Sequence, residues 1–230
     1  MEDTKKELSD LSYKFVSILE NGRQYMKIMN KYRCAIMEVE TKLNVLNAEF
    51  SLQYDRNPFE SIESRLKSPA SIIEKLERKV PDLTEDKIGE SIEKYLYDVA
   101  GIRVVCAFPE DIYRLAELLV NQDDIRLIRT KDYIKNPKPN GYRSLHLILE
   151  IPVFLEEGKV AVKVEVQFRT IAMDFWASVD HKLRYKKDLP NEAEIVEKLQ
   201  RCADAITALD CEMQEIRNMI EQEGEASVFS

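Results

Sequence analysis

The segment 160–168 has valine or phenylalanine at every second position, and this alternation constrains the fold more than any other feature of the chain. Successive side chains of a β-strand point to opposite faces of its sheet, so the valines and Phe168 are expected to face a hydrophobic core. Lys163, Glu165 and Gln167 then share the opposite face. The segment therefore predicts a strand with one buried face and one polar face.

Two more segments predict strands with the same division. In 144–151 three leucines alternate with a set that includes His146, and in 101–108 Arg103 stands among β-branched residues. If the three strands are neighbours, one sheet surface gathers the polar residues Arg103, His146, Glu165 and Gln167. Such a surface is typical of a ligand-binding floor, although polar residues on an open antiparallel sheet can also simply contact water.

Apolar residues at helical spacing precede and follow the predicted sheet in the sequence. We expect two helices, arranged as a hairpin, between residues 2 and 54, and a long helical region from Ile171 to about Glu221 with a break near Pro190. Shorter helices are expected at 69–79, 85–96 and 109–121, and a further strand at 125–130.

This order of elements predicts an α+β fold in which helices pack on one face of a mixed sheet. A chain of 230 residues can enclose one good core together with a helical appendage. We therefore expect an N-terminal helical segment (1–56), a core (57–187) and a C-terminal helix (188–230).

The C-terminal helix has an apolar stripe longer than one small domain needs to cover itself. The stripe consists of Ile195, Leu199, Cys202, Ile206, Leu209, Met213, Ile216 and Ile220. Two interpretations stay open: self-association through this helix, or packing of the helix onto its own sheet.

Composition and charge exclude several classes of protein. A net charge of −8 disfavours a general positive field for holding long nucleic acid, so any phosphate site must be built from local basic residues. The four cysteines form no C-x-x-C pair and there are only two histidines, which predicts reduced thiols rather than a zinc site. The N-terminus lacks the pattern of a secretory signal, and no apolar run is long enough for a membrane span, so we expect a soluble cytoplasmic protein.

A basic helix face follows the turn at Pro69. Ser71, Lys75 and Arg78 recur at i, i+4 and i+7, and Arg65 and Lys67 come just before them. Four positive charges in a short stretch of an acidic chain suit a triphosphate, with guanidinium groups binding in a bidentate manner. A solvated amphipathic helix has similar spacing, so this pattern alone is not specific.

The loop 131–146 combines prolines, lysines and two tyrosines. Stiffening by Pro137 and Pro139 would preorganise cations for phosphate and an aromatic platform for a base. A surface loop with incidental lysines is the alternative.

Four runs together resemble the synthetase domain of the RelA/SpoT family, and the chain is similar to the small alarmone synthetases. The runs are RLKSPASIIEKLER (65–78), YDVAGIRVVC (97–106), KDYIKNPKPNGYRSLH (131–146) and VEVQFRTIAMDFWASVDHKLRYK (164–186). The resemblance implies a nucleotidyltransferase-like fold and transfer of the β,γ-diphosphate of ATP to the 3′-hydroxyl of GDP or GTP. The products would be AMP and (p)ppGpp, and Mg²⁺ would be the only cofactor.

The resemblance also implies residue roles. Asp98 and Glu165 match the acidic pair of the family: Asp98 is expected to hold Mg²⁺, and Glu165 to share the metal or to accept the 3′-hydroxyl proton. The ATP site would comprise Arg65, Lys67, Ser71, Lys75, Arg78 and Arg103, with Arg65 and Arg103 on either side of adenine. The GDP or GTP site would comprise Lys131, Lys138, Tyr142, His146, Gln167 and Asp174, with Tyr142 stacked on guanine and Asp174 reading its edge.

The chain lacks the His-Asp pair of the family's hydrolase domain, so we expect synthesis without hydrolysis. Some small members form tetramers with a regulatory nucleotide in a central cleft, and a homo-oligomer is expected here, with allostery left open. The alternatives are a nucleotidyltransferase of the same fold, which usually has closely spaced paired aspartates, and a non-catalytic nucleotide- or RNA-binding module. The acidic pair argues against a dead enzyme, and the net charge does not support RNA binding.

Overall fold

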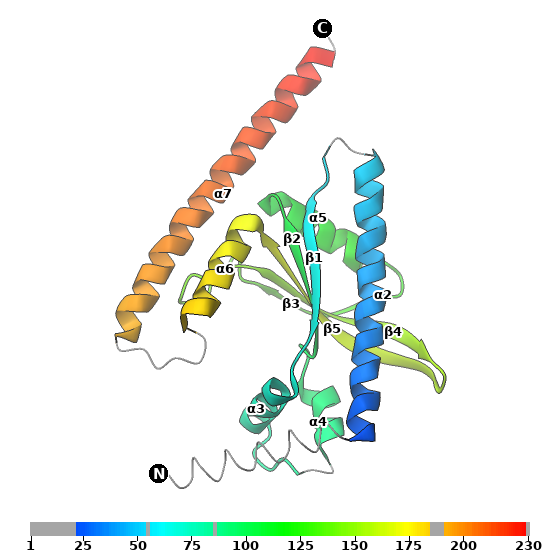
Figure 1. The fold of residues 1–230 in the computed structure, drawn as a ribbon. Coiled ribbons are helices and arrows are strands. Elements are labelled where there is room, and N and C mark those ends of the chain that lie inside the picture. Colours follow the sequence, from blue (N-terminus) through cyan, green and yellow to red (C-terminus); the bar gives the residue numbers. More distant parts are fainter. Residues whose placement is uncertain (1–21, 54–55, 85–86, 185–190, 229–230) are drawn as a thin grey trace.

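A five-stranded mixed sheet forms the centre of the protein (Figure 1). The computed structural model describes residues 22–53, 56–84, 87–184 and 191–228. The strands are β1 (Phe59–Leu66), β2 (Ala100–Cys106), β3 (Arg126–Asp132), β4 (Leu145–Leu155) and β5 (Gly158–Thr170), in the spatial order β1-β2-β5-β4-β3. β2 and β5 are parallel, and the other neighbouring pairs are antiparallel. The expected α+β class with a mixed sheet is confirmed.

The three strands that were predicted to share a polar face are neighbours. Gln167 on β5 pairs in register with Arg103 on β2 and with His146 on β4. β1 was missed by the sequence analysis, which predicted no strand before residue 101. This edge strand lacks a regular alternation, and its pairing with β2 is irregular between Phe59 and Ser61.

Six helices of the described residues surround the sheet. They are α2 (Arg23–Gln53), α3 (Pro69–Lys79), α4 (Ile88–Tyr95), α5 (Pro109–Val120), α6 (Ile171–Arg184) and α7 (Glu192–Val228). α2 corresponds to the second helix of the expected N-terminal hairpin, whereas the first helix falls outside the described residues. α3 begins as predicted, because Pro69 occupies its first turn and the Ser68 hydroxyl accepts a hydrogen bond from the Ser71 backbone N–H.

The hydrophobic core lies on the valine-rich face of the sheet. Val164, Val166 and Phe168 of β5 are fully buried, as the alternation predicts, and α2 runs across β1, β2, β4 and β5 while α5 packs on β2, β4 and β5. Burial of these side chains is the main driving force for the fold. Polar side chains of β5 are consequently left on the opposite face, where the candidate site lies.

α7 is long and extends beyond the body of the protein (Figure 1). One face of α7 packs on the domain: Asp210 accepts a hydrogen bond from Thr170, and the Gln214 amide oxygen accepts one from the Glu110 backbone N–H. A second face has exposed hydrophobic residues at heptad spacing, namely Leu209, Met213, Ile216 and Ile220. α7 therefore packs on its own domain through one face and leaves part of its apolar stripe exposed. Both interpretations that the sequence left open remain.

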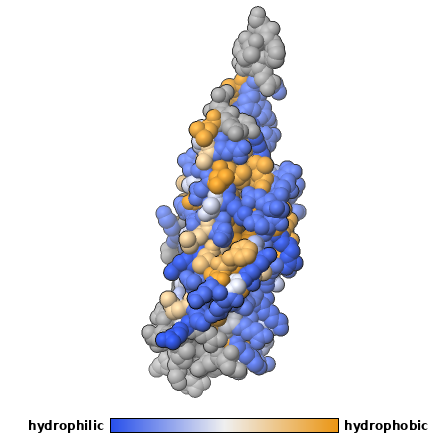
Figure 2. All heavy atoms as spheres, turned by 90° about the vertical axis from the view of Figure 1, so that its right-hand side faces the viewer, coloured by the Kyte–Doolittle hydropathy of each residue, from blue (hydrophilic) through white to orange (hydrophobic). Residues whose placement is uncertain are grey.

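Hydrophobic residues also reach the surface on the α2 side of the molecule. Figure 2 views this side and shows hydrophobic patches separated by hydrophilic surface. The exposed hydrophobic residues of α2 include Met37 and Val45. Among the described helices, none combines the length and the apolar character that crossing a membrane requires.

Candidate functional site

The polar face of the sheet centres on β5. Glu165, Gln167 and Arg169 alternate along this strand and therefore project to the same side. Arg103 on β2 and His146 on β4 flank Gln167 in register. The polar surface predicted from alternation is thus one contiguous set of charged and polar side chains.

Glu165 is buried on this face and its carboxylate is held from both sides. His146 Nδ1 lies 3.3 Å from Oε1, and Gln167 Nε2 donates to Oε2 at 2.7 Å. Burial raises the pKa of Glu165, but the hydrogen bonds from His146 and Gln167 outweigh it, so the pKa lies below its usual value. The nearby Asp98 charge acts in the opposite direction on this pKa. β2 pairs with β5 so that Gly101, three residues after Asp98, lies opposite Glu165.

Asp98 lies in the segment that leads from α4 into β2. Lys75 Nζ and Lys67 Nζ both donate to Oδ2, at 2.6 Å and 3.0 Å, while Oδ1 is buried without a hydrogen-bond partner. Burial raises the pKa of Asp98, and the two lysines more than compensate, so the pKa is lowered. Asp98 is therefore a charged carboxylate with one oxygen engaged by two lysines and one oxygen buried without a hydrogen-bond partner.

The chemistry of this pair fits a hard divalent cation. Mg²⁺ prefers carboxylate oxygen and is commonly held by one or two protein carboxylates, with water and substrate phosphates completing its shell. Within the ranges that the structure describes, no group of three or more His, Cys, Asp or Glu side chains is arranged to hold a metal ion. Asp98 and Glu165 are the two carboxylates that could hold such an ion.

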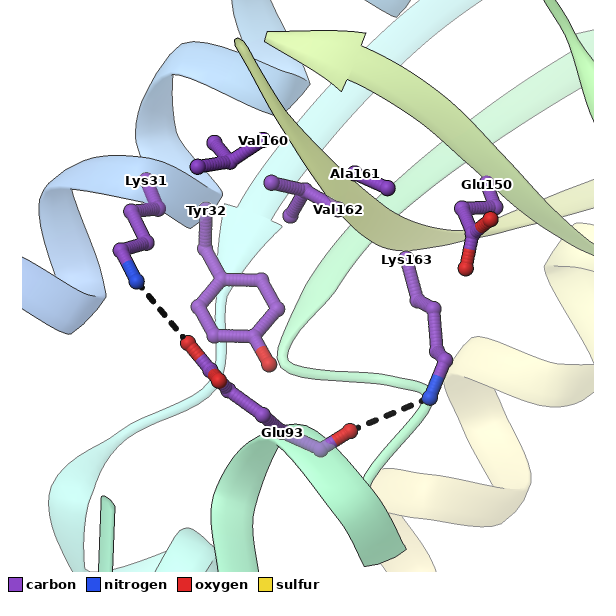
Figure 3. Close-up of a pocket in the computed structure, with 8 residues that line it drawn as sticks. All are labelled: Lys31, Tyr32, Glu93, Glu150, Val160, Ala161, Val162 and Lys163. Atoms are coloured by element: carbon purple, nitrogen blue, oxygen red, sulfur yellow. Dashed lines mark hydrogen bonds and ion pairs between the residues drawn. The ribbon is translucent and has the colours of Figure 1, made fainter. Parts of the chain in front are cut away.

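Figure 3 shows a second pocket, beside the polar face, whose lining includes Lys31, Glu93 and Lys163. Lys163, on β5, connects this strand to the segment around Glu93 and Tyr97. Lys163 Nζ donates to the Glu93 backbone carbonyl at 3.1 Å and lies 4.6 Å from the centroid of the Tyr97 ring. Glu93 also pairs with Lys31 at 3.1 Å. These contacts connect β5, which carries Glu165, to the segment that contains Asp98. Both lysines of the pocket, Lys31 and Lys163, therefore have partners within the protein.

A concave surface above β1 and β2 adjoins the polar face. Arg65 and Arg103 line it, as do Gly101, Gln167 and Arg169 and the α6 residues Ala177, Ser178, Asp180, His181 and Lys182. Two arginines about a pocket are suited to stack on a nucleobase. Arg65 and Arg103, both predicted for the ATP site, thus share one pocket.

The remaining residues predicted for the ATP site differ in where they lie. Lys67 and Lys75 converge on Asp98. The Ser71 hydroxyl accepts a hydrogen bond from Ser68 at 2.9 Å at the start of α3. Arg78 is 69 % exposed and pairs with Glu74 at 3.8 Å, so its side chain lies in solvent in this structure.

Tyr142 is the centre of the group predicted for the guanosine nucleotide. Its hydroxyl lies 2.9 Å from His146 Nε2, and Lys138 Nζ lies 4.5 Å from its ring centroid. Burial and the neighbouring Lys131 charge lower the pKa of Lys138. Lys131 itself pairs with His146 in register. Four of the predicted residues therefore lie together beside Gln167.

Asp174 joins the same face through two arginines. Its Oδ1 accepts hydrogen bonds from Arg103 at 3.0 Å and from Arg169 at 2.8 Å. Arg169 was not among the predicted site residues. The alternation that selected Glu165 and Gln167 extends one step further to Arg169, so the sequence contained a signal for this residue.

Comparison with known proteins gives a consistent result. The region found in RelA / SpoT proteins matches residues 64–189. The GTP pyrophosphokinase YwaC of Bacillus subtilis (strain 168) is 40 % identical over 190 residues, which cover 83 % of this chain and 89 % of the relative.

Two solved structures share the fold. The small alarmone synthetase 1 of Bacillus subtilis bound to its product pppGpp superposes with a TM-score of 0.77 at 36 % identity, covering 86 % of this chain and 98 % of the other. The same synthetase bound to AMPCPP gives a TM-score of 0.69 at 31 % identity, with the same coverage. These chains are similar to this one over almost their whole lengths.

Proposed function

The chain belongs to the RelA/SpoT family, and from this premise we propose that it is a small alarmone synthetase, a GTP pyrophosphokinase. It transfers the β,γ-diphosphate of ATP to the 3′-hydroxyl of GDP or GTP and releases AMP and (p)ppGpp. The observation that carries the proposal is the register of β2 and β5, which places Gly101, three residues after Asp98, opposite Glu165. Lysines flank Asp98 on one side, and Tyr142 and His146 flank Glu165 on the other.

Glu165 is the group that accepts the proton of the attacking 3′-hydroxyl. A general base must be ionised and within hydrogen-bond reach of the hydroxyl. The bonds from His146 and Gln167 keep the buried carboxylate ionised and fix its direction. Proton acceptance at one of its oxygens makes the ribose oxygen a better nucleophile toward the β-phosphorus of ATP.

Mg²⁺ belongs to the proposal as the cofactor, held by Asp98 with a contribution from Glu165. When bound, the ion supplies neutralisation of charge on the phosphate oxygens during transfer. The unpartnered Oδ1 of Asp98 supports this assignment.

The basic residues bind and orient the donor nucleotide. Lys67 and Lys75 lie where the phosphates of ATP would approach Asp98, and ammonium groups stabilise such charge without a fixed bonding geometry. Arg65 and Arg103 hold adenine across the pocket that they line. Ser71 and Arg78, at the start and end of α3, complete the proposed donor site.

Tyr142 stacks on the guanine of the acceptor, and Lys131 and Lys138 bind its phosphates. His146 and Gln167 orient the ribose beside Glu165, and Asp174 accepts hydrogen bonds from the guanine edge. The present pairing of Asp174 with two arginines requires it to use its second oxygen, or to exchange partners, when the acceptor binds.

We further propose that the chain forms a homo-oligomer through α7 and acts in the cytoplasm. The exposed residues Leu209, Met213, Ile216 and Ile220 recur every three or four positions, which is the seam of a coiled coil. A second copy of the same helix is the partner whose surface matches this seam, and association of two such dimers would give the expected tetramer.

The activity is tested by incubating the purified protein with γ-labelled ATP, Mg²⁺ and GDP, GTP or GMP in separate reactions. The proposal predicts labelled guanosine products with GDP or GTP as acceptor. Labelled inorganic phosphate as the only product, with every acceptor, would contradict it.

A further inference from the structure

Arg169 is a buried charged residue on the polar face, and the proposed reaction assigns it no role. Arg169 is buried, with 11 % of its side chain exposed, and its Nε has no hydrogen-bond partner. A buried donor without a partner costs about 1–3 kcal/mol. Residues that break such a rule of stability are expected at functional sites.

The two protons of Arg169 Nη2 begin two chains of hydrogen bonds. Nη2 donates to the Tyr142 hydroxyl at 2.8 Å and to Gln167 Oε1 at 3.2 Å. The Tyr142 hydroxyl lies 2.9 Å from His146 Nε2, and His146 Nδ1 lies 3.3 Å from Glu165 Oε1. Gln167 Nε2 donates to Glu165 Oε2 at 2.7 Å. Both chains therefore start on Arg169 and end on Glu165.

The direction of donation is the same along both chains. A guanidinium group has only donors and an ionised carboxylate has only acceptors, so each group between them accepts on one side and donates on the other. The amide of Gln167 must then turn its NH₂ toward Glu165. His146 must carry a proton on Nδ1, and the Tyr142 hydroxyl donates to Nε2.

We propose that Arg169 is a positioning residue, which orients Glu165 through Tyr142–His146 on one oxygen and through Gln167 on the other. This inference rests on the proposed function, in which Glu165 meets the 3′-hydroxyl. Without Arg169, the Gln167 amide and the Tyr142 hydroxyl are free to rotate, and Glu165 loses the two supports that fix its direction. Hydrogen-bonded chains of this kind strengthen each other, so the loss exceeds that of one bond.

The test is a mutant cycle on kcat. Arg169→Met is expected to lower kcat on the order of 10- to 100-fold, with the KM for ATP changed by less than about threefold. In the background Tyr142→Phe/Gln167→Met, where both chains are already cut, Arg169→Met is expected to lower kcat by less than about twofold. An equal loss in both backgrounds, or no loss in the wild-type background, would overturn the proposal.

A second readout needs no activity and uses the two histidines of the chain. In ¹⁵N-histidine-labelled protein without substrate, the His146 Nδ1–H is expected to give a slowly exchanging downfield resonance, assigned with the variant His181→Gln. Arg169→Met is expected to shift and broaden this resonance, whereas Gln167→Met, which cuts only the other chain, retains it. An unchanged resonance in Arg169→Met would contradict the inference.

The two readouts separate the inference from the proposed function. If the wild-type protein forms no guanosine product, the proposed function fails, and the resonance still decides whether Arg169 orders the chain through His146. If Arg169→Met does not fold, Arg169→Lys replaces it. Lysine keeps the positive charge beside Asp174, but its single nitrogen cannot donate to Asp174, Tyr142 and Gln167 at the same time. We therefore expect Arg169→Lys to lower kcat as much as Arg169→Met does.

Discussion

Lys75 Nζ lies 2.6 Å from Oδ2 of Asp98, and this ion pair ties α3 to the segment that enters β2. Lys67 donates to the same oxygen. Two ammonium groups therefore fix one oxygen of the carboxylate, and the other, Oδ1, faces the interior without a hydrogen-bond partner. The two ion pairs thus fix the orientation of the Asp98 carboxylate.

Asp98→Asn is expected to lower kcat by at least about 100-fold, because the amide removes the charge that holds the cation and balances the lysines. The loss of two charge-assisted hydrogen bonds is expected to lower the free energy of unfolding by about 1–3 kcal/mol. Diphosphate-transfer assays and thermal unfolding measure the two effects. The matched control is Asp124→Asn, which removes a surface carboxylate paired with Lys42 and is expected to retain kcat. Activity of Asp98→Asn within tenfold of wild type would argue against the metal site.

Two substitutions of Tyr142 separate its ring from its hydroxyl. Tyr142→Ala removes the platform for guanine and is expected to raise the KM for the acceptor by about 5- to 150-fold, the equivalent of about 1–3 kcal/mol of stacking. Tyr142→Phe keeps the ring but cuts the bond to His146, so it is expected to lower kcat more than it raises this KM. Steady-state kinetics with varied GDP or GTP measure both constants. Equal acceptor KM values for Tyr142→Ala and wild type would remove the stacking role.

The stability of the protein is expected to depend on the ionisation of Asp210. Burial raises the pKa of this carboxyl and the hydrogen bond from Thr170 only partly offsets it, so the folded protein binds the proton more tightly than the unfolded chain. The resulting destabilisation is absent below the unfolded pKa of about 4 and grows as pH rises through the raised folded value. Asp210→Asn mimics the protonated form and can still accept the Thr170 hydrogen bond. We expect this variant to be more stable than wild type at neutral pH, and we expect the difference to disappear in acid. Urea unfolding at several pH values measures this difference in the free energy of unfolding. A difference that does not change with pH would refute the assignment of the pH dependence to Asp210.

Charges on the exposed seam of α7 are expected to dissociate the oligomer. The double variant Leu209→Glu/Ile216→Glu places carboxylates where two copies of the helix would meet. Light scattering is expected to show a smaller mass for this variant than for wild type. Ala208→Glu, on an exposed position of the same helix away from both the seam and the packed face, serves as the control and is expected to keep the wild-type mass. A monomeric wild-type protein would end the proposal of self-association.

Alternation along strands made much of the fold and of the polar face predictable. The valines of β5 face the core and Glu165 faces the site, because a buried face and a polar face leave a period-two pattern in the sequence. Pro69 likewise identified the start of α3, because proline is favoured in the first turn of a helix. β1 was not predicted, since an edge strand with an irregular register carries little of that pattern.

The partners of the site residues were less predictable than the residues themselves. The ion pairs of Asp98 with Lys67 and Lys75 join three separate segments, which come together only in the folded chain. The exposure of Arg78 and the pairing of Asp174 with Arg103 and Arg169 depend on side-chain conformation, which spacing along the chain does not specify.

Diphosphate transfer differs from nucleotidyl transfer in which bond of ATP is broken, and the fate of its phosphorus atoms measures this directly. ATP labelled at the β- or the γ-phosphorus in separate reactions, with Mg²⁺ and GDP, is followed by chromatography of all products. The account predicts that both labels enter the guanosine product in equal amounts, with one AMP released for each molecule formed. Release of labelled pyrophosphate, with AMP attached to the acceptor, would contradict it.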